Sequence, residues 1–386
     1  MSVMRGKALA AGVALGVVVG GLAAVPAHAA GGQTFTVTST SMCGGAGTFE
    51  QAVKDANANP GKDTIEFTPG LSVDVSICAT LHAGVEEFPV RATDAVDIIG
   101  NGAKVLGNQW WVNANGHVND INSCPSALGS DAHWISLSKG FLALGEYGKD
   151  NSAVQVGLRG LSFDNVPELF AAYEQSSLTV SDVQAIHINS FNSSCSRPAI
   201  EAFTGADVTL RDVQISESSA PGIGRTEFDI KGLVTGFGGD LVMDRVFLGD
   251  NLQGRAVGWG DVGASQASVK IVSSKIVNSG GLRLGATHSD VVNTIYYTRW
   301  QTPADRVVAS EGATHVNASS FYWDEPKCTP NCPNTGMGFW IPASGTIDFT
   351  STAIGGWGTY PDSGPLLFGN VQNFSSDALT WVQPTV

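Results

Sequence analysis

The chain has few charged residues, and positive charge is the scarcer sign. Of its 386 residues 15% are Asp, Glu, Lys or Arg, with 21 basic side chains against 35 acidic ones. No stretch gathers Lys and Arg into a basic stripe that would neutralise phosphates, so nucleic acid and anionic membrane are not expected partners. The formal net charge of -14 instead favours solubility outside the cell.

Long apolar runs and familiar catalytic motifs are also missing. After residue 30 no run reaches the length of a transmembrane helix, and residues 374–386 show neither an apolar tail nor a basic stop. The sequence contains no Gly-x-Ser-x-Gly, no His-Glu-x-x-His and no phosphate loop. We therefore expect the mature chain not to insert into a membrane, and to be released unless a partner holds it.

The one long apolar run lies at the N-terminus. Arg5 and Lys7 precede small apolar residues at 8–24, and Ala27-His28-Ala29 has the form of a cleavage site. We predict a secretory signal peptide at residues 1–29 and a single domain at residues 30–386, secreted and extracellular or associated with the cell surface. Cleavage removes two positive charges and no acid, which changes the net charge from -14 to -16.

The six cysteines are an even number in an exported chain, which favours disulfides over metal ligation or catalysis. Several pairings are open. Proximity suggests Cys328 with Cys332, and the further guesses are Cys43 with Cys78 and Cys124 with Cys195. No metal site is expected, because neither His-x-x-His nor a second close cysteine pair accompanies Cys328 and Cys332.

The sequence does contain a repeated phrase of the pattern apolar-x-apolar-x-x-apolar-x-apolar. Its clearest copies are residues 178–185, 208–215, 241–248 and 271–278. Each half alternates like a half-buried strand, and the two extra residues in the middle bend the chain while keeping the apolar side chains inward. An earlier copy lies at 156–163, and looser copies lie at 316–321 and 347–354.

The spacing of the copies predicts the fold class. The anchor residues Val183, Val213, Val246 and Ile276 recur at intervals of 30, 33 and 30, which is typical of stacked repeats. No copy can bury its apolar side alone, but coils stacked as parallel strands would share one core. We predict an all-β parallel β-helix solenoid with the four anchors in one internal column. The alternative is an antiparallel sandwich, whose strands rarely repeat one corner phrase in register.

Residues 30–106 are expected to form an N-terminal cap and the first coils. Thr48 and Gln51 have the spacing of a capping box, and the apolar residues that follow mark one face of a short helix. Strands are expected on both sides of this helix, at residues 34–39, 63–67 and 96–102.

Residues 35–67, followed by Ile98-Ile-Gly-Asn-Gly102, resemble the opening module of bacterial right-handed parallel β-helix proteins, secreted or on the cell surface, of the pectate-lyase-like class. The resemblance implies a right-handed β-helix whose short N-terminal helix covers the first coil and removes an exposed pairing edge. It implies fold far more than activity, because such solenoids host lyases, hydrolases, epimerases, adhesins and inert surface proteins. The polygalacturonase-like motifs Asn-Thr-Asp, Asp-Asp and Gly-His-Gly are absent.

Three segments are expected to be insertions between coils: residues 107–134, 287–311 and 321–340. Insertions in a solenoid often gather on its binding face. These segments are rich in aromatic residues, whose flat rings suit stacking on pyranose rings. Ordinary packing of the loops is the alternative. The predicted substrate-binding residues are Trp110, Trp111, Tyr296, Arg299 and Trp300.

Stacking would also align two sets of polar residues. The residues before the anchors are Asp182, Asp212, Arg245 and Lys275, a predicted column of two acids above two bases. Its alternative role is a solvated ladder of little energetic weight. The fourth residues after the anchors of successive copies are Asn165, His187, Glu217 and Asp250.

These sets suggest two chemistries. A glycoside hydrolase needs two carboxylates flanking the glycosidic bond, and Glu217 and Asp250 on adjacent coils would supply them. A lyase needs a base beside a uronic acid carboxylate, with Arg, Lys or calcium to neutralise that carboxylate. The predicted catalytic set is Glu217, Asp250, Asp261, Arg255 and Lys275, without a cofactor unless a lyase uses calcium.

The sequence thus predicts a secreted protein that binds extracellular polysaccharide or cell-surface glycan; whether it also cleaves this ligand, as a lyase or glycoside hydrolase, is left open by the sequence. The alternative is a non-catalytic surface or adhesion protein.

Overall fold

In the computed structural model, the described part of the chain is almost entirely β-structure. The residues described are 32–75, 78, 88–107, 111–112, 118–119, 135–136, 140–188, 198–218, 232–250, 255–260, 267–299, 308–310, 312–324, 339–340, 345–357, 367–368, 371–372 and 379–381. The predicted signal peptide lies outside these residues. Within them, no helix has the length and apolar character needed to span a membrane.

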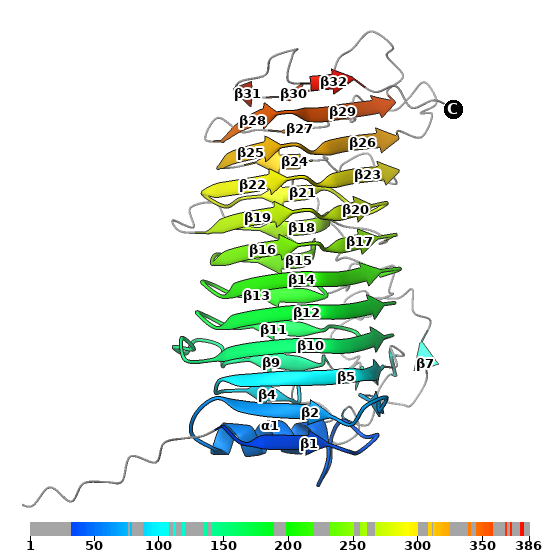
Figure 1. Cartoon of the computed structure of the whole chain (residues 1–386), viewed down its shortest axis with the longest axis vertical. Helices are drawn as coiled ribbons and strands as arrows, with labels where there is room; N and C mark the ends of the chain where they lie inside the picture. The colour runs from blue at the N-terminus through cyan, green and yellow to red at the C-terminus, as the bar shows by residue number, and fades with distance from the viewer. Residues whose placement is uncertain are drawn as a thin grey trace, which may run out of the picture. The chain divides into compact units, whose positions relative to one another are not determined.

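Two parallel sheets contain most of the described strands (Figure 1). The larger sheet has 19 strands among the described residues: β1 (Thr34–Val37), β2 (Asp63–Phe67), β3 (Ser72–Asp74), β5 (Val96–Leu106), β10 (Gln155–Asp164), β12 (Ser177–Ile186), β14 (Asp207–Ser216), β16 (Asp240–Asp244), β17 (Phe247–Gly249), β19 (Ser268–Val272), β20 (Lys275–Val277), β22 (His288–Val292), β23 (Ile295–Arg299), β25 (Ala313–Asn317), β26 (Ser320–Asp324), β28 (Thr346–Thr350), β29 (Thr352–Trp357), β31 (Val371–Gln372) and β32 (Leu379–Trp381).

The second sheet has ten described strands: β4 (Arg91–Ala92), β9 (Leu142–Leu144), β11 (Phe170–Ala172), β13 (Ile200–Ala202), β15 (Gly232–Gly236), β18 (Arg255–Trp259), β21 (Leu282–Leu284), β24 (Val308–Ser310), β27 (Phe339–Trp340) and β30 (Leu367–Phe368). A small antiparallel sheet is formed by β6 (Trp111–Val112), β7 (Val118–Asn119) and β8 (Ile135–Ser136), within and just after the predicted insertion at 107–134.

The chain alternates between the two parallel sheets, and one passage through both is called a coil below. Corresponding strands of successive coils pair in parallel, so that Leu158 lies beside Val180, and Val180 beside Leu210. These inward residues are buried in one continuous apolar core. The many-stranded parallel sheets and the shared core are consistent with the predicted all-β solenoid.

The predicted corner within each repeat is present as a single bend residue. Asp182, Asp212 and Arg245 have φ angles of 52°, 53° and 55°, in the left-handed region that non-glycine residues rarely adopt. Because the bend residue sits at the same place in successive coils, the strand segments on both sides stay in register. The expected bend is therefore present, but two short strands meet at it only from β16 and β17 onward, whereas β12 and β14 each run through it as one strand.

The predicted position of the fourth anchor, Ile276, is wrong. Val183 lies beside Val213 as predicted, but Ile276 pairs with Leu248 instead of continuing the column from Val246. The residue next to Val246 is Ser274, whose hydroxyl accepts a hydrogen bond of 3.1 Å from the Val246 amide. The coil is 28 residues long at this point, so the assumed interval of 30 displaced the alignment by two.

A ladder of buried hydroxyl groups replaces valine in the later coils. It consists of Ser274, Thr294, Ser319 and Thr352. Each hydroxyl donates to the backbone carbonyl two residues before it, at 2.9, 3.1, 2.9 and 2.9 Å respectively. The hydroxyl groups are therefore satisfied without water, as burial requires.

The described residues of two predicted insertions are strands of regular coils, which corrects the predictions for these residues. Within 287–311, β22 and β23 pair on both sides with strands of neighbouring coils, and β24 pairs with β21 and β27. Within 321–340, most of β26 and all of β27 are likewise coil strands. Tyr296 lies between Ile276 and Phe321, so the 45 residues from 276 to 321 are two coils of 20 and 25 residues.

Helix α1 (Phe49–Ala58) packs at the β1 end of the stack (Figure 1). The Thr48 side chain accepts a hydrogen bond from the Gln51 amide, as the capping-box spacing predicts. Phe49 reaches into the core and stacks on Phe141, with ring centroids 4.8 Å apart.

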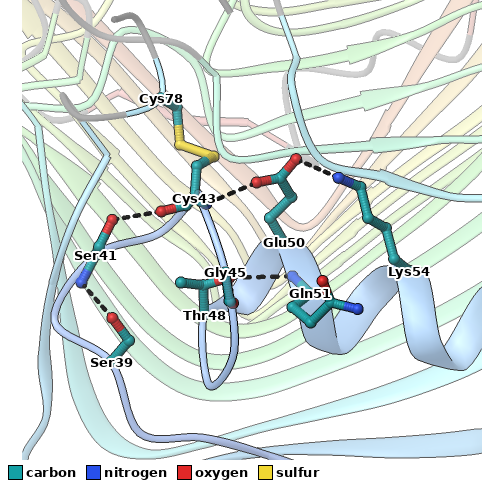
Figure 2. Close-up of a disulfide and its surroundings, with 10 residues drawn as sticks. Ser39, Ser41, Cys43, Gly45, Thr48, Glu50, Gln51, Lys54 and Cys78 are labelled. Atoms are coloured by element: carbon teal, nitrogen blue, oxygen red, sulfur yellow. Dashed lines mark hydrogen bonds and ion pairs between the residues drawn. A yellow bond between two sulfur atoms is a disulfide. The ribbon is translucent and has the colours of Figure 1, made fainter. Parts of the chain in front are cut away.

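Figure 2 shows the disulfide between Cys43 and Cys78, which joins the loop before α1 to the segment after β3. This predicted pair is confirmed. Cys124, Cys195, Cys328 and Cys332 lie outside the described residues. The Glu50 carboxylate accepts a hydrogen bond from the Gly44 amide and pairs with Lys54, which fixes the loop that carries Cys43.

Candidate functional site

A column of polar residues follows the ends of the larger sheet's strands, and it contains the predicted carboxylate pair. We call it the corner column; its members are Asn165, His187, Glu217, Asp250 and Asn278. Their φ angles lie between 47° and 59°, so each marks a second bend of its coil. Backbone hydrogen bonds join successive coils here, including Glu217 N to Gly249 O at 3.0 Å and Asp250 N to Val277 O at 2.9 Å.

The structure therefore brings Glu217 and Asp250 together on adjacent coils, as the sequence predicted. Backbones of neighbouring parallel strands lie about 4.8 Å apart. Both residues are exposed, and the Glu217 side chain keeps 65% of its surface. The Asp250 carboxylate accepts a hydrogen bond of 2.7 Å from the Asn278 side chain, so its neighbour on the far side from Glu217 holds it in place.

His187 links the corner column to an acid on the preceding coil. Its Nδ1 lies 2.8 Å from an Asp164 carboxylate oxygen, and its Nε2 lies 3.3 Å from Glu217 Oε2. The hydrogen bond to Asp164 raises the pKa of His187 above its ordinary value, and the charge of Glu217 acts in the same direction. A proton donor thus touches one of the two candidate catalytic carboxylates. The sequence placed His187 in this set but gave it no chemical role.

Two other members of the predicted catalytic set lie apart from this pair. Arg255 begins β18 in the second sheet, where it is 6% exposed. Lys275 lies on β20 beside Phe247, not beside Arg245, because of the two-residue shift in register. Asp261 lies outside the described residues. Neither Arg255 nor Lys275 joins the corner column, which corrects their grouping with Glu217 and Asp250.

The predicted column of two acids above two bases is wrong at its fourth place. Asp182, Asp212 and Arg245 do occupy successive bends, but the next bend residue is Ser273. Two nitrogens of Arg245 donate to the Asp212 carboxylate at 2.7 and 2.8 Å. This contact lowers the pKa of Asp212, and both side chains are about half exposed. This geometry matches the alternative role considered for the column, a solvated ladder of exposed charges.

The predicted sugar-stacking residues lie in different environments. Tyr296 is fully buried in the core, where its ring stacks on Phe321 with centroids 5.8 Å apart. Its ring cannot meet an external sugar, which corrects that assignment. Arg299 ends β23, and Trp111 pairs within the small antiparallel sheet. Trp110 and Trp300 lie outside the described residues.

An aromatic stack beside the second sheet was missed. Tyr173, Phe203 and Phe237 follow β11, β13 and β15, and their successive ring centroids lie 4.8 and 6.3 Å apart. Tyr147, 73% exposed, lies nearly perpendicular to the first two rings. The sequence does indicate this stack, because Tyr173, Phe203 and Phe237 recur at intervals of 30 and 34 residues, close to the spacing of the repeats.

Across the described ranges, no group of three or more His, Cys, Asp or Glu side chains is arranged to hold a metal ion. The carboxylates of the corner column are instead engaged by His187 and Asn278. This donor arrangement does not fit the calcium considered for a lyase.

A scan against models of known protein families gives no match to the chain, and a search of curated proteins gives no significant match.

Proposed function

We propose that the protein is a secreted right-handed parallel β-helix with an N-terminal capping helix, of the pectate-lyase-like class, which binds and hydrolyses extracellular polysaccharide. Residues 1–29 serve as its signal peptide. The parallel register of successive coils and the position of α1 at the first strands support this fold. The disulfide between Cys43 and Cys78 suits an oxidising compartment outside the cytoplasm.

The observation that carries the activity is the contact of Glu217 with His187 next to Asp250. Hydrolysis of a glycosidic bond needs one group that protonates the leaving oxygen and one carboxylate that activates water or attacks the sugar directly. Asp250 is the candidate for the second role. Glu217, whose Oε2 lies 3.3 Å from His187 Nε2, is the candidate for the first, with the His187 imidazolium as the source of its proton. The exposure of the column leaves room for a long chain lying along it.

A screen of the purified protein tests this proposal. It covers neutral and acidic polysaccharides and measures both new reducing ends and the absorbance of unsaturated products. Glu217→Gln and Asp250→Asn should each abolish product formation and leave the thermal unfolding temperature unchanged. Asp182→Asn is the matched control, because it removes one exposed acid from a bend outside the corner column. Full cleavage by both variants would end the assignment.

A second candidate is a non-catalytic surface or adhesion protein. Hydrogen bonds between side chains of neighbouring coils favour this candidate. Asn278 bonds Asp250, and His187 bonds Asp164, so these pairs also form a ladder that holds the coils in register. Retention of a polysaccharide without any product in the same screen would select this candidate.

The lyase form of the hypothesis has less support. It needs an Arg or Lys beside the substrate carboxylate, but Arg255 is buried in the second sheet and Lys275 lies beside Phe247 on β20. An increase in absorbance of unsaturated products would select the lyase against the hydrolase.

A further inference from the structure

A groove of about 260 Å³ lies on the outward face of the larger sheet, over β2, β5, β10 and β12. It lies on strand segments before the first bend, whereas the corner column follows the ends of the strands. The strand backbone forms its floor. Its polar lining consists of Thr64, Asp97, Arg159, Thr179 and Ser181.

The groove exists because one side chain is missing from a row of outward residues. Thr64, Asp97, Gly157 and Thr179 lie side by side on successive coils. A Cβ atom at Gly157 would lie 2.6 Å from Asp97 Oδ1, so any side chain there would displace the carboxylate. Gly157 is not among the residues with positive φ, so its backbone does not require glycine. The glycine therefore serves to keep the groove open and is not needed for a turn.

The lining offers donors and acceptors without excess charge. The Asp97 carboxylate is held by Lys62 Nζ at 2.8 Å and remains about half exposed. Arg159, on the next coil, is exposed and lies in the same row as Glu66. The lining itself contains one acid, Asp97, and one cation, Arg159, and this balance disfavours selection for a charged ligand. Three hydroxyl side chains complete the polar lining, and Ile98, Ile99 and Leu158 also line the groove.

We propose that this groove binds a sugar unit of a neutral polysaccharide, at a site separate from the corner column. A carboxylate acceptor, a guanidinium donor and hydroxyl groups match the vicinal hydroxyls of an uncharged pyranose. The bare peptide at Gly157 gives the ring a flat surface to approach. The inference rests on the proposed function for its ligand class, and it holds whether or not the chain is cleaved.

Affinity electrophoresis of the full mature chain in gels containing galactomannan, xyloglucan or hydroxyethylcellulose provides the test, with polygalacturonate as the acidic comparison. Gly157→Thr fills the groove with a residue suited to a strand. It should weaken retention by a neutral polymer about tenfold. Arg159→Ala and Thr179→Ala remove polar groups of the lining without filling the groove. Both variants should also weaken retention by the neutral polymer. Their unfolding temperatures report whether each variant folds.

Arg211→Ala is the matched control. Arg211 lies two coils from Arg159 in the same outward row, outside the groove, and its loss changes the charge equally. Retention should be unchanged. Normal binding by Gly157→Thr, Arg159→Ala and Thr179→Ala overturns the groove assignment, even if Glu217→Gln still abolishes cleavage.

Two further outcomes are informative. Retention by polygalacturonate alone overturns the neutral ligand class. No retention by any polymer overturns this inference together with polysaccharide binding, whereas groove-dependent retention without cleavage supports the groove and rejects only the hydrolytic part of the proposed function.

Discussion

The imidazole of His187 bridges two carboxylates from different coils, with Nδ1 2.8 Å from Asp164 and Nε2 3.3 Å from Glu217. Both nitrogens donate only when the ring is protonated. The arrangement therefore favours the imidazolium form, chiefly through the hydrogen bond to Asp164. It couples the protonation of one residue to the register of three successive coils.

The first prediction concerns pH. Because the pKa of His187 is raised on folding, its contribution to stability is fully present below the unfolded value of about 6.5 and is lost as the pH rises through the folded pKa. All three side chains are substantially exposed, so the contribution should stay below about 1 kcal/mol. Histidine NMR titration measures the pKa, and unfolding of His187→Gln at several pH values measures the stability.

Asp164→Asn is the informative control for that titration. It removes the main cause of the shift and should return the His187 pKa toward its ordinary value, with a smaller effect from Glu217→Gln. A His187 pKa at or below 6.5 in the unaltered protein would contradict the structure.

The coils between Leu178 and Leu241 were predictable because their inward positions are apolar and their lengths, 30 and 33 residues, are similar. Val183 and Val213 pair as the interval of 30 requires, and the αL bends fall on the two extra residues of the repeated phrase. The same periodicity is enough to predict that Glu217 and Asp250 lie on neighbouring coils.

The later coils were misassigned because two signals change together. The column that begins with valine continues through buried hydroxyls, so a pattern of apolar anchors does not include Ser274 and Thr294. The coils also shorten to 20 residues between Ile276 and Tyr296, below the interval of the earlier repeats. Tyr296 was consequently counted as part of an insertion, although it occupies an inward position. The groove depends on a missing side chain at Gly157, which periodicity does not report.

The second prediction concerns the disulfide. Cys43 and Cys78 are 35 residues apart, and both are buried beside the cap. Cys43→Ala with Cys78→Ala should lower the free energy of unfolding by about 2–4 kcal/mol, mainly by freeing the unfolded chain. Thermal and denaturant unfolding provide the measurement. Ser41→Ala is a nearby control, because it removes only the hydrogen bond to the Cys43 carbonyl. Equal stability of the double variant and the unaltered protein would show that the cap does not depend on this bond.

The third prediction separates packing from ligand binding at Tyr296. Its ring is fully buried against Phe321, so Tyr296→Ala should lower the free energy of unfolding by about 3–5 kcal/mol through the cavity it leaves. Tyr296→Phe keeps the ring and loses a hydrogen bond of 3.4 Å to the Ser279 carbonyl, which should cost about 1 kcal/mol or less. Tyr297→Ala, at the adjacent outward position, is the control for removing a tyrosine from the same strand. Chemical denaturation measures stability, and affinity electrophoresis measures retention by the neutral polymers. Tyr296→Phe should bind them normally; weaker binding at unchanged stability would restore a role for this residue in substrate recognition.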